Sequence, residues 1–144
     1  MKPSPFLTPA DESRVLDAIR RAETGTTGEI RICVASTTAS DTQASARQAF
    51  ERLAMHQTRD RNGVLIYLAP KSRTLAIIGD AGIHQHGGDP FWAAIAGQLS
   101  RDFAAGSVAA GLEHAIQEIG TALSLHFPRS QNDTNELPDT IASD

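Results

Sequence analysis

Acidic and amide side chains stand beside glycines at separate places in the chain, a combination that suits binding of a hard divalent cation. Glu29 follows one glycine, Asp60 and Asn62 precede a second, Asp80 lies between two more, and Asp89 ends the loop that begins there. Carboxylate and amide oxygens are ligands that Ca²⁺ and Mg²⁺ prefer, and glycines let backbone carbonyls approach closely. The same residue types also form turns and helix caps, so a purely structural role stays open.

These residues can form one site only if the elements between them bring them together. Capping residues, prolines and the spacing of apolar residues divide the chain into seven elements. They predict helices over residues 9–23, 41–57, 89–106 and 107–128, and strands over residues 29–35, 63–69 and 74–80. The strand over residues 63–69 is apolar throughout, which is typical of a central strand covered on both faces.

The order of the elements predicts an α/β fold, a three-layer α/β/α sandwich with a small mixed sheet of three or four strands. A strand–helix–strand crossover makes the first two strands parallel, and a turn of hairpin length returns the third strand antiparallel. The three acidic stretches then meet at one end of the sheet. We expect Asp60, Asn62 and Asp80 to be metal ligands there, with Glu29 and Asp89 as further candidates.

Other residues could carry different chemistry. At the opposite end of the sheet, Lys71 and Arg73 lie near the helix that starts at Asp41, an arrangement that suits a phosphate group. However, the chain has no glycine-rich phosphate loop, and Asp41 would itself occupy the helix terminus. His84 and His86 lie on a glycine-rich loop and could ligate zinc, or they could simply be solvated.

Composition and charge exclude several classes of function. The net charge is −4 with no run of like charges, so the basic surface that nucleic-acid binding requires is missing. No stretch approaches the roughly 20 apolar residues that cross a bilayer, and no secretory signal is found at the N-terminus. The single cysteine, Cys33, lies in mid-strand and is expected to pack as a small apolar side chain rather than act as a nucleophile.

From these features we expect a cytoplasmic monomer that neither binds nucleic acid nor inserts into a membrane, with any protein partner unknown. Residues 1–128 are expected to form a single domain, because no internal repeat or second core is evident. Residues 129–144 are polar and acidic without a sustained period, which predicts a flexible tail.

The same stretches resemble those of the TPM domain family, whose members occur in the thylakoid lumen, in photosystem repair and at membranes. The resemblance extends over about residues 6–140, and the end of the chain is similar to a short, leaderless bacterial branch of the family. The stretches that carry it are residues 27–30, 62–67, 78–83, 103–106, 111–112 and 135–139.

The resemblance implies a compact α/β/α sandwich, calcium or magnesium binding as in some relatives, and acid phosphatase activity as claimed for a plant member. Asn62 and Gly63 fall on the family's acidic Asn/Asp-Gly-Val motif. Two positions depart from the family pattern: Arg61 stands where an acid is common, and His84 stands where secreted members have glutamate.

Three hypotheses follow. The first is a divalent-cation binding module that acts through the acidic loops. The second is a weak metal-dependent acid phosphatase or phosphoesterase, in which a bound cation activates water and Arg61 stabilises transition-state charge. The third, suggested by the family alone, is an accessory partner of a membrane-associated complex. Whether the chain is an enzyme stays undecided by sequence.

Overall fold

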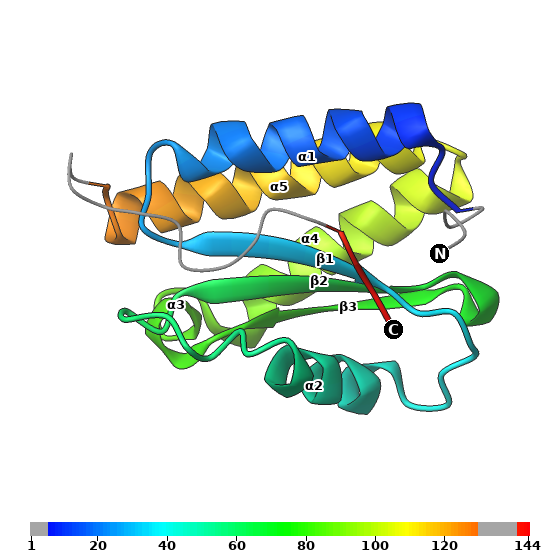
Figure 1. Ribbon diagram of the computed structural model, residues 1–144, viewed down its shortest axis with the longest axis horizontal. Helices are drawn as coiled ribbons and strands as arrows, with labels where there is room; N and C mark the ends of the chain where they lie inside the picture. The colour runs from blue at the N-terminus through cyan, green and yellow to red at the C-terminus, as the bar shows by residue number, and fades with distance from the viewer. Residues whose placement is uncertain (1–5, 130–140) are drawn as a thin grey trace.

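The computed structural model describes residues 6–129 and 141–144, which build one sheet with helices on both faces (Figure 1). The elements are α1 (Pro9–Glu23), β1 (Glu29–Val34), α2 (Thr42–Arg52), β2 (Gly63–Ala69), the 3₁₀ turn η1 (Pro70–Ser72), β3 (Thr74–Gly79), α3 (Ala81–His84), α4 (Gly88–Ala104), α5 (Val108–His126) and β4 (Ala142–Ser143). The predicted α/β/α sandwich is confirmed.

The sheet has the strand order β3-β2-β1-β4. β1 and β2 are parallel, with Glu29 opposite Gly63, and β3 returns antiparallel, with Gly79 opposite Val64. The sheet is therefore mixed, and β2 is one of its two central strands, as the continuous apolar run predicted.

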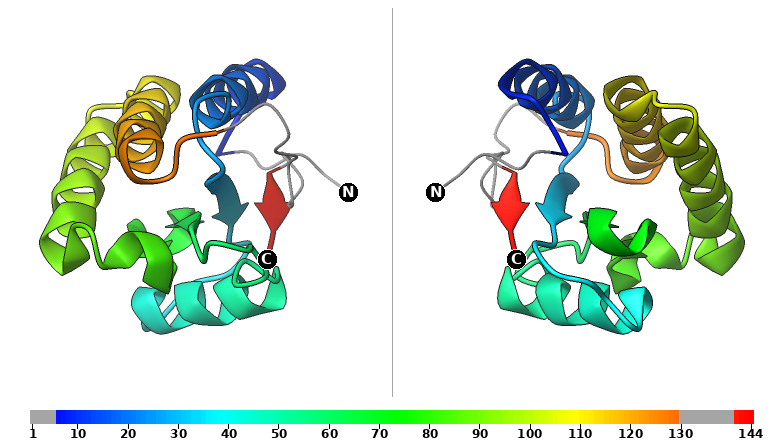
Figure 2. Two further views of the ribbon diagram at one scale, coloured as in Figure 1. Left: turned by 90° about the vertical axis from the view of Figure 1, so that its left-hand side faces the viewer. Right: turned by 90° about the vertical axis from the view of Figure 1, so that its right-hand side faces the viewer.

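Helices α1, α4 and α5 cover one face of the sheet and α2 covers the other, as the end-on views show (Figure 2). Alternate residues of β2 contribute to two separate cores, because successive side chains of a strand point to opposite faces. Val64, Ile66 and Leu68 pack with the three-helix layer, whereas Leu65 and Tyr67 pack with α2.

The first helix begins where its capping residues predict. Thr8 Oγ1 accepts a hydrogen bond from Asp11 N at 3.1 Å, and Thr8 N donates to Asp11 Oδ2 at 3.3 Å. This reciprocal capping box satisfies backbone donors that the first turn of a helix leaves free.

Helix α2 ends at Arg52, not at residue 57 as expected, because the chain turns left-handed at Ala54 (φ +57°). Met55 N donates to Phe50 O at 3.0 Å and Ala54 N donates to Glu51 O at 3.0 Å, the bonding pattern of a Schellman motif. Met55 is fully buried in the same core as Phe50, so its burial stabilises the turn that ends the helix.

The segment after β3, expected to be a loop over residues 81–88, contains the one-turn helix α3. Asp80 caps it, with Oδ1 accepting from Ala81 N at 2.8 Å, and Ile83 is buried in the larger core. The cap and the apolar anchor together outweigh the turn-forming tendency of the neighbouring glycines.

The end of the chain adds a strand that the sequence did not predict. Ala142 and Ser143 form β4, parallel to β1, and Ala142 is buried. Of the flexible tail expected over residues 129–144, residues 130–140 lie outside the described part of the chain. Among the described residues, no helix combines the length and the apolar character needed to cross a bilayer.

Candidate functional site

The end of the sheet where β1 and β2 start and β3 finishes brings the three acidic stretches together, as chain direction predicted. Asp80 N donates to Gly63 O at 2.9 Å, and Glu29 N approaches Asn62 O at 3.4 Å. A Cβ at Gly82 would lie 2.1 Å from the carbonyl oxygen of Asp60, so only glycine allows these two loops to approach so closely. The segments near residues 29, 62 and 80 are therefore spatial neighbours.

Asp80 forms a two-point ion pair with Arg61. Arg61 Nε donates to Asp80 Oδ2 at 2.7 Å, and Arg61 Nη2 donates to Asp80 Oδ1 at 2.9 Å. The Asp80 side chain is only 5% exposed, whereas that of Arg61 is 54% exposed and extends from a left-handed residue (φ +50°). The hydrogen bond and the charge of Asp80 raise the pKa of Arg61, so the guanidinium keeps its positive charge.

A second network joins Asp60 to Asn62 through Thr27. Thr27 Oγ1 donates to Asp60 Oδ2 at 3.2 Å and accepts from Asn62 Nδ2 at 3.0 Å, while Asn62 N donates to Thr58 Oγ1 at 3.2 Å. Asn62 is fully buried, yet its Oδ1 has no hydrogen-bond donor within the described part of the chain. A buried acceptor without a donor is unfavourable, so this oxygen is open to a further positive partner.

The remaining two predicted ligands differ in where they lie relative to these networks. Glu29 is buried at the start of β1. The side chain of Asp89 is 95% exposed, and its Oδ1 lies 3.7 Å from His84 Nε2 rather than beside Asp60. Within residues 6–129 and 141–144, no three histidine, cysteine or carboxylate side chains converge in a group that could hold a metal ion by themselves.

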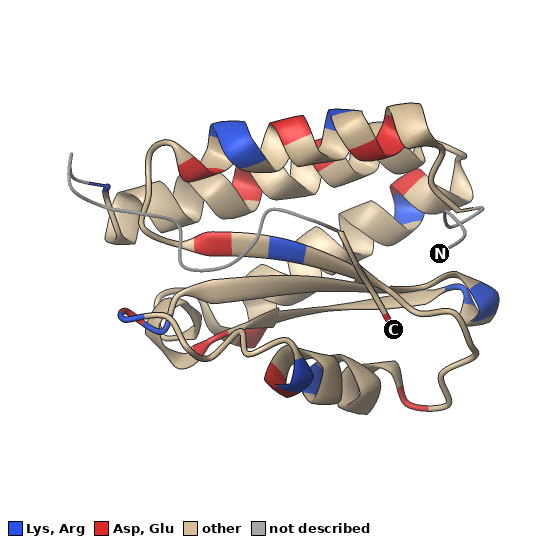
Figure 3. Cartoon of the chain, viewed as in Figure 1, with Lys and Arg blue, Asp and Glu red and all other residues tan. Residues whose placement is uncertain are grey.

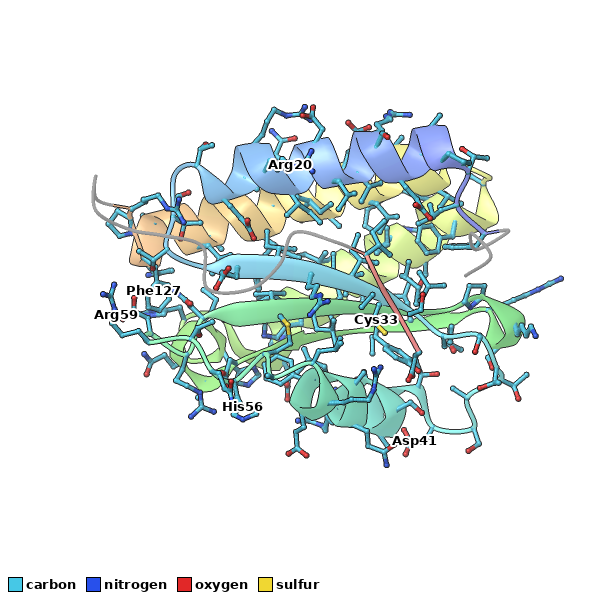
Figure 4. All side chains as sticks on the ribbon, in the orientation of Figure 1. Arg20, Cys33, Asp41, His56, Arg59 and Phe127 are labelled. Carbon is cyan, nitrogen blue, oxygen red and sulfur yellow. The ribbon has the colours of Figure 1, made fainter. Side chains whose placement is uncertain are left out.

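Charges of both signs gather at this end of the molecule (Figure 3). Arg59 and Phe127 lie toward this end too, whereas Asp41 lies toward the opposite end (Figure 4). Arg59 Nε is 3.7 Å from Asp60 Oδ1. Asp60 and Asp80 thus each lie within ion-pair distance of an arginine.

The sequence did not anticipate the Asp80–Arg61 pair or the bridging role of Thr27. From the sequence, Arg61 is expected to stabilise transition-state charge at a position where the family commonly has an acid, and no role is expected for Thr27. The substitution of an acid by arginine directly before Asn62 was the available signal, because a cation placed between acidic stretches requires a carboxylate partner.

A further polar cluster lies where β4 joins β1, and the sequence did not indicate it. Asp144 Oδ2 accepts from the Tyr67 hydroxyl at 2.7 Å, and Asp144 Oδ1 accepts from Arg52 Nη2 at 2.9 Å. Burial, and then the contact with Asp144, raise the pKa of Tyr67. Burial also raises the pKa of the Cys33 thiol, which agrees with the expected packing role of that residue.

The architecture and the oxygen-rich loops define a small α/β/α domain with a polar end. The sequence matches the TPM domain family over residues 2–122, and the chain belongs to that family. The protein BA42 from the psychrophilic bacterium Bizionia argentinensis has a similar solution structure, with 38% identity, 99% coverage of both chains and a TM-score of 0.88.

Two more distant solution structures share the fold. One is the N-terminal domain of a protein from P. gingivalis, with 17% identity, a TM-score of 0.71 and coverage of 89% of this chain and 84% of the other. The second is the N-terminal domain of the cg2496 protein from Corynebacterium glutamicum, with 16% identity, a TM-score of 0.64 and coverage of 83% and 76%. No curated protein matches.

Proposed function

We propose that this TPM domain binds a divalent cation, Ca²⁺ or Mg²⁺, at the end of the sheet where the acidic loops meet. Asp60, Asn62 and Asp80 would supply the side-chain oxygens. Glu29 lies beside them in the sheet, whereas Asp89 faces His84 and would contribute only to the surrounding charge. The bound ion would fix the three loops relative to one another.

The observation that carries the proposal is the Asn62 Oδ1 atom, a fully buried acceptor that lacks a donor within the described residues. It lies in the network that contains the Asp60 carboxylate, and the segments of that network adjoin Asp80. Hard cations favour carboxylate, amide and carbonyl oxygens, which are the donor types present at this end.

Arg61 limits how Asp80 can bind a cation, because its guanidinium already pairs with the Asp80 carboxylate. A divalent cation that uses Asp80 must displace Arg61, whose half-exposed side chain can move into solvent. Arg61 would then act as a competitor built into the site, and the affinity for the cation would be weaker than the two carboxylates and the amide would give without it.

Phosphate-ester hydrolysis is not part of this proposal, because His84 and His86, the two histidines that could act as a general base for it, are held in other contacts. His84 Nδ1 accepts from Trp92 Nε1 at 3.0 Å, and the His86 ring stacks on that of His126 with centroids 3.8 Å apart. A general base must reach the proton that it removes, and neither ring contacts Asp60 or Asn62 through any hydrogen bond found among the described residues.

The decisive experiment titrates the metal-free full chain with CaCl₂ and MgCl₂, followed by calorimetry and by backbone amide shifts. We expect saturable shifts at residues 27–29, 60–63 and 80–82. The Asp80→Asn variant keeps a good helix cap and should weaken binding at least about tenfold, because a charged ligand is lost. Asp17→Asn, on the exposed face of α1, serves as the matched control and should bind as the parent does.

The Arg61→Gln variant tests whether Arg61 competes with the cation for Asp80 or only stabilises the fold. If Arg61 competes with the cation, its removal should tighten binding about 5- to 10-fold, which corresponds to roughly 1–1.4 kcal/mol. Absence of heat and of shifts with both cations, in the parent and in Arg61→Gln, would disprove the proposal.

A further inference from the structure

The outer backbone edge of β3 is free of partners among the described strands, because β3 pairs only with β2. Asp80 N bonds to Gly63 O, and the antiparallel pattern alternates from that pair along the strand. Leu75, Ile77 and Gly79 therefore direct their N–H and C=O groups away from β2. None of these three makes a hydrogen bond to another element in the described part of the chain.

A groove of about 790 Å³ runs along this edge. Its floor is the strand itself, residues 75–80, and the helices α2 and α4 pack on either side of β3 (Figure 2). The α2 wall contributes Gln43, Arg47, Phe50 and Glu51, and the α4 wall contributes Trp92, Ala93 and Ala96.

We propose that this groove binds an extended peptide segment of a partner protein, which adds an antiparallel strand to β3. Backbone donors and acceptors that recur at every second residue are matched by another extended backbone, which is the basis of recognition by strand addition. A helix satisfies its backbone N–H and C=O groups internally, so it cannot form hydrogen bonds with the free backbone groups of β3.

The depth of the edge argues against a second copy of the chain as the occupant. Ala76, Ile77 and Ile78 are buried although they belong to an edge strand, because the two flanking helices rise above them. Two such recessed edges cannot approach each other to the roughly 4.8 Å that paired strands require without collision between the helices. A single extended chain meets no such obstacle.

The charges along the groove indicate where an antiparallel partner strand would carry a basic residue. Thr42 Oγ1 and Thr74 Oγ1 are 2.6 Å apart, so α2 and β3 start together, and Glu51 lies toward the Gly79 end of the groove. Asp89 lines that end as well, and Glu51 makes no ion pair among the described residues. An antiparallel partner strand enters at this end, where a lysine or arginine near its N-terminus would be attracted.

The walls indicate the side chains that the partner would present. On the α4 side, Ala93 and Ala96 leave room for apolar side chains of medium size above Trp92. On the α2 side, Gln43, Arg47 and Glu51 favour polar side chains. Since successive side chains of a strand alternate between the two walls, the preferred segment alternates apolar and polar residues after a basic one.

The test uses the full chain and an acetylated, amidated heptapeptide that begins with lysine and then alternates valine with threonine. We expect the amides of Leu75, Ile77 and Gly79 to shift and to exchange with solvent more slowly as peptide is added. The amides of Ala76 and Ile78 already bond to β2, so their exchange should change little. Chelator should have no effect, which separates this site from the proposed cation site.

Two matched pairs make the test specific. N-methylation of the peptide amides that face β3 should weaken binding at least about tenfold, whereas N-methylation of the opposite amides should not. Ala93→Trp should block the groove, while Ala94→Trp, on the exposed neighbouring position of the same helix and outside the groove lining, should bind as the parent does. A peptide with glutamate in place of lysine should bind more weakly.

Two outcomes would overturn the proposal. The first is the absence of any shift along β3 at millimolar peptide, or binding that Ala93→Trp leaves intact. The second is protection of the Ile77 and Gly79 amides in the free protein together with concentration-dependent sedimentation, because the occupant would then be a second copy of this chain.

Discussion

The two edges of the sheet differ in whether a strand of the chain covers them. At the β1 edge the chain places its own strand β4 and holds it with Asp144, which bonds to Tyr67 and Arg52. At the β3 edge no described strand follows, and two helices leave the backbone at the bottom of a groove. An unprotected edge invites pairing with other chains, so proteins cover such edges or restrict access to them. The β1 edge is covered by β4, whereas the β3 edge is accessible only to a chain narrow enough to enter the groove between α2 and α4.

Removal of residues 141–144 should have the largest effect, because it turns the covered edge into an open one. Asp144 N bonds to Val34 O at 3.1 Å, Ser36 N bonds to Asp144 O at 3.3 Å, and the Asp144 side chain adds its two contacts. At roughly 1 kcal/mol for each of these four hydrogen bonds, we expect a loss of about 4 kcal/mol in unfolding free energy, measured by urea denaturation.

Cys33 gives an independent readout of the same deletion. Its backbone pairs with Ala142, and it is fully buried in the intact chain (Figure 4). Its reaction with a thiol reagent should accelerate at least about tenfold when β4 is absent. An unchanged reaction rate together with unchanged stability would show that β4 does not cover this edge in solution.

The Tyr67–Asp144 contact should have an intermediate effect. We expect Tyr67→Phe and Asp144→Ala each to lower the unfolding free energy by about 1–2 kcal/mol, with a coupling energy near 1 kcal/mol in the double-mutant cycle. The coupling arises because both substitutions remove the same 2.7 Å hydrogen bond. Ser143→Ala, at an exposed neighbouring position, should change stability by less than about 0.5 kcal/mol. Strictly additive losses would mean that the hydroxyl and the carboxylate act separately.

Chain direction is the part of the structure that sequence reasoning could supply. The crossover rule and the hairpin-length turn fixed which ends of β1, β2 and β3 meet, and the register bears this out. The acidic stretches therefore became neighbours as expected. Their metal-ligand role, and the predicted cytoplasmic location and monomeric state, stay predictions.

The hydrogen-bond and ion-pair partners of individual side chains could not be predicted from the sequence in the same way. The pair between Arg61 and Asp80 depends on a left-handed backbone at Arg61, which is uncommon for a residue other than glycine and has no sequence signal here. Strand β4 is only two residues long and follows a polar stretch of sequence, so no alternation of apolar and polar residues predicts it. The lone Tyr67 in an otherwise apolar strand was a usable signal, because a buried hydroxyl requires a partner.

Alkaline pH should remove the stabilisation that the Tyr67–Asp144 contact gives to the covered edge. The pKa of Tyr67 is raised in the folded chain, so the stabilisation is fully present below the ordinary tyrosine pKa of about 10 and is lost as pH rises through the folded value. At pH 11 the unfolded chain gains about 1.4 kcal/mol by ionising its tyrosine, while the folded chain gains little.

The stability gap between the parent and Tyr67→Phe should therefore shrink by about 1.4 kcal/mol between pH 8 and pH 11, since only the parent has this hydroxyl. Tyr67 is the single tyrosine of the chain, so absorbance near 295 nm follows its ionisation without interference from another phenol. Folded protein should ionise well above pH 10 and urea-unfolded protein near pH 10. If the folded chain titrated at the ordinary value, or the gap stayed constant, the hydroxyl would be solvated rather than bonded to Asp144, and the β1 edge would be held by its backbone pairing alone.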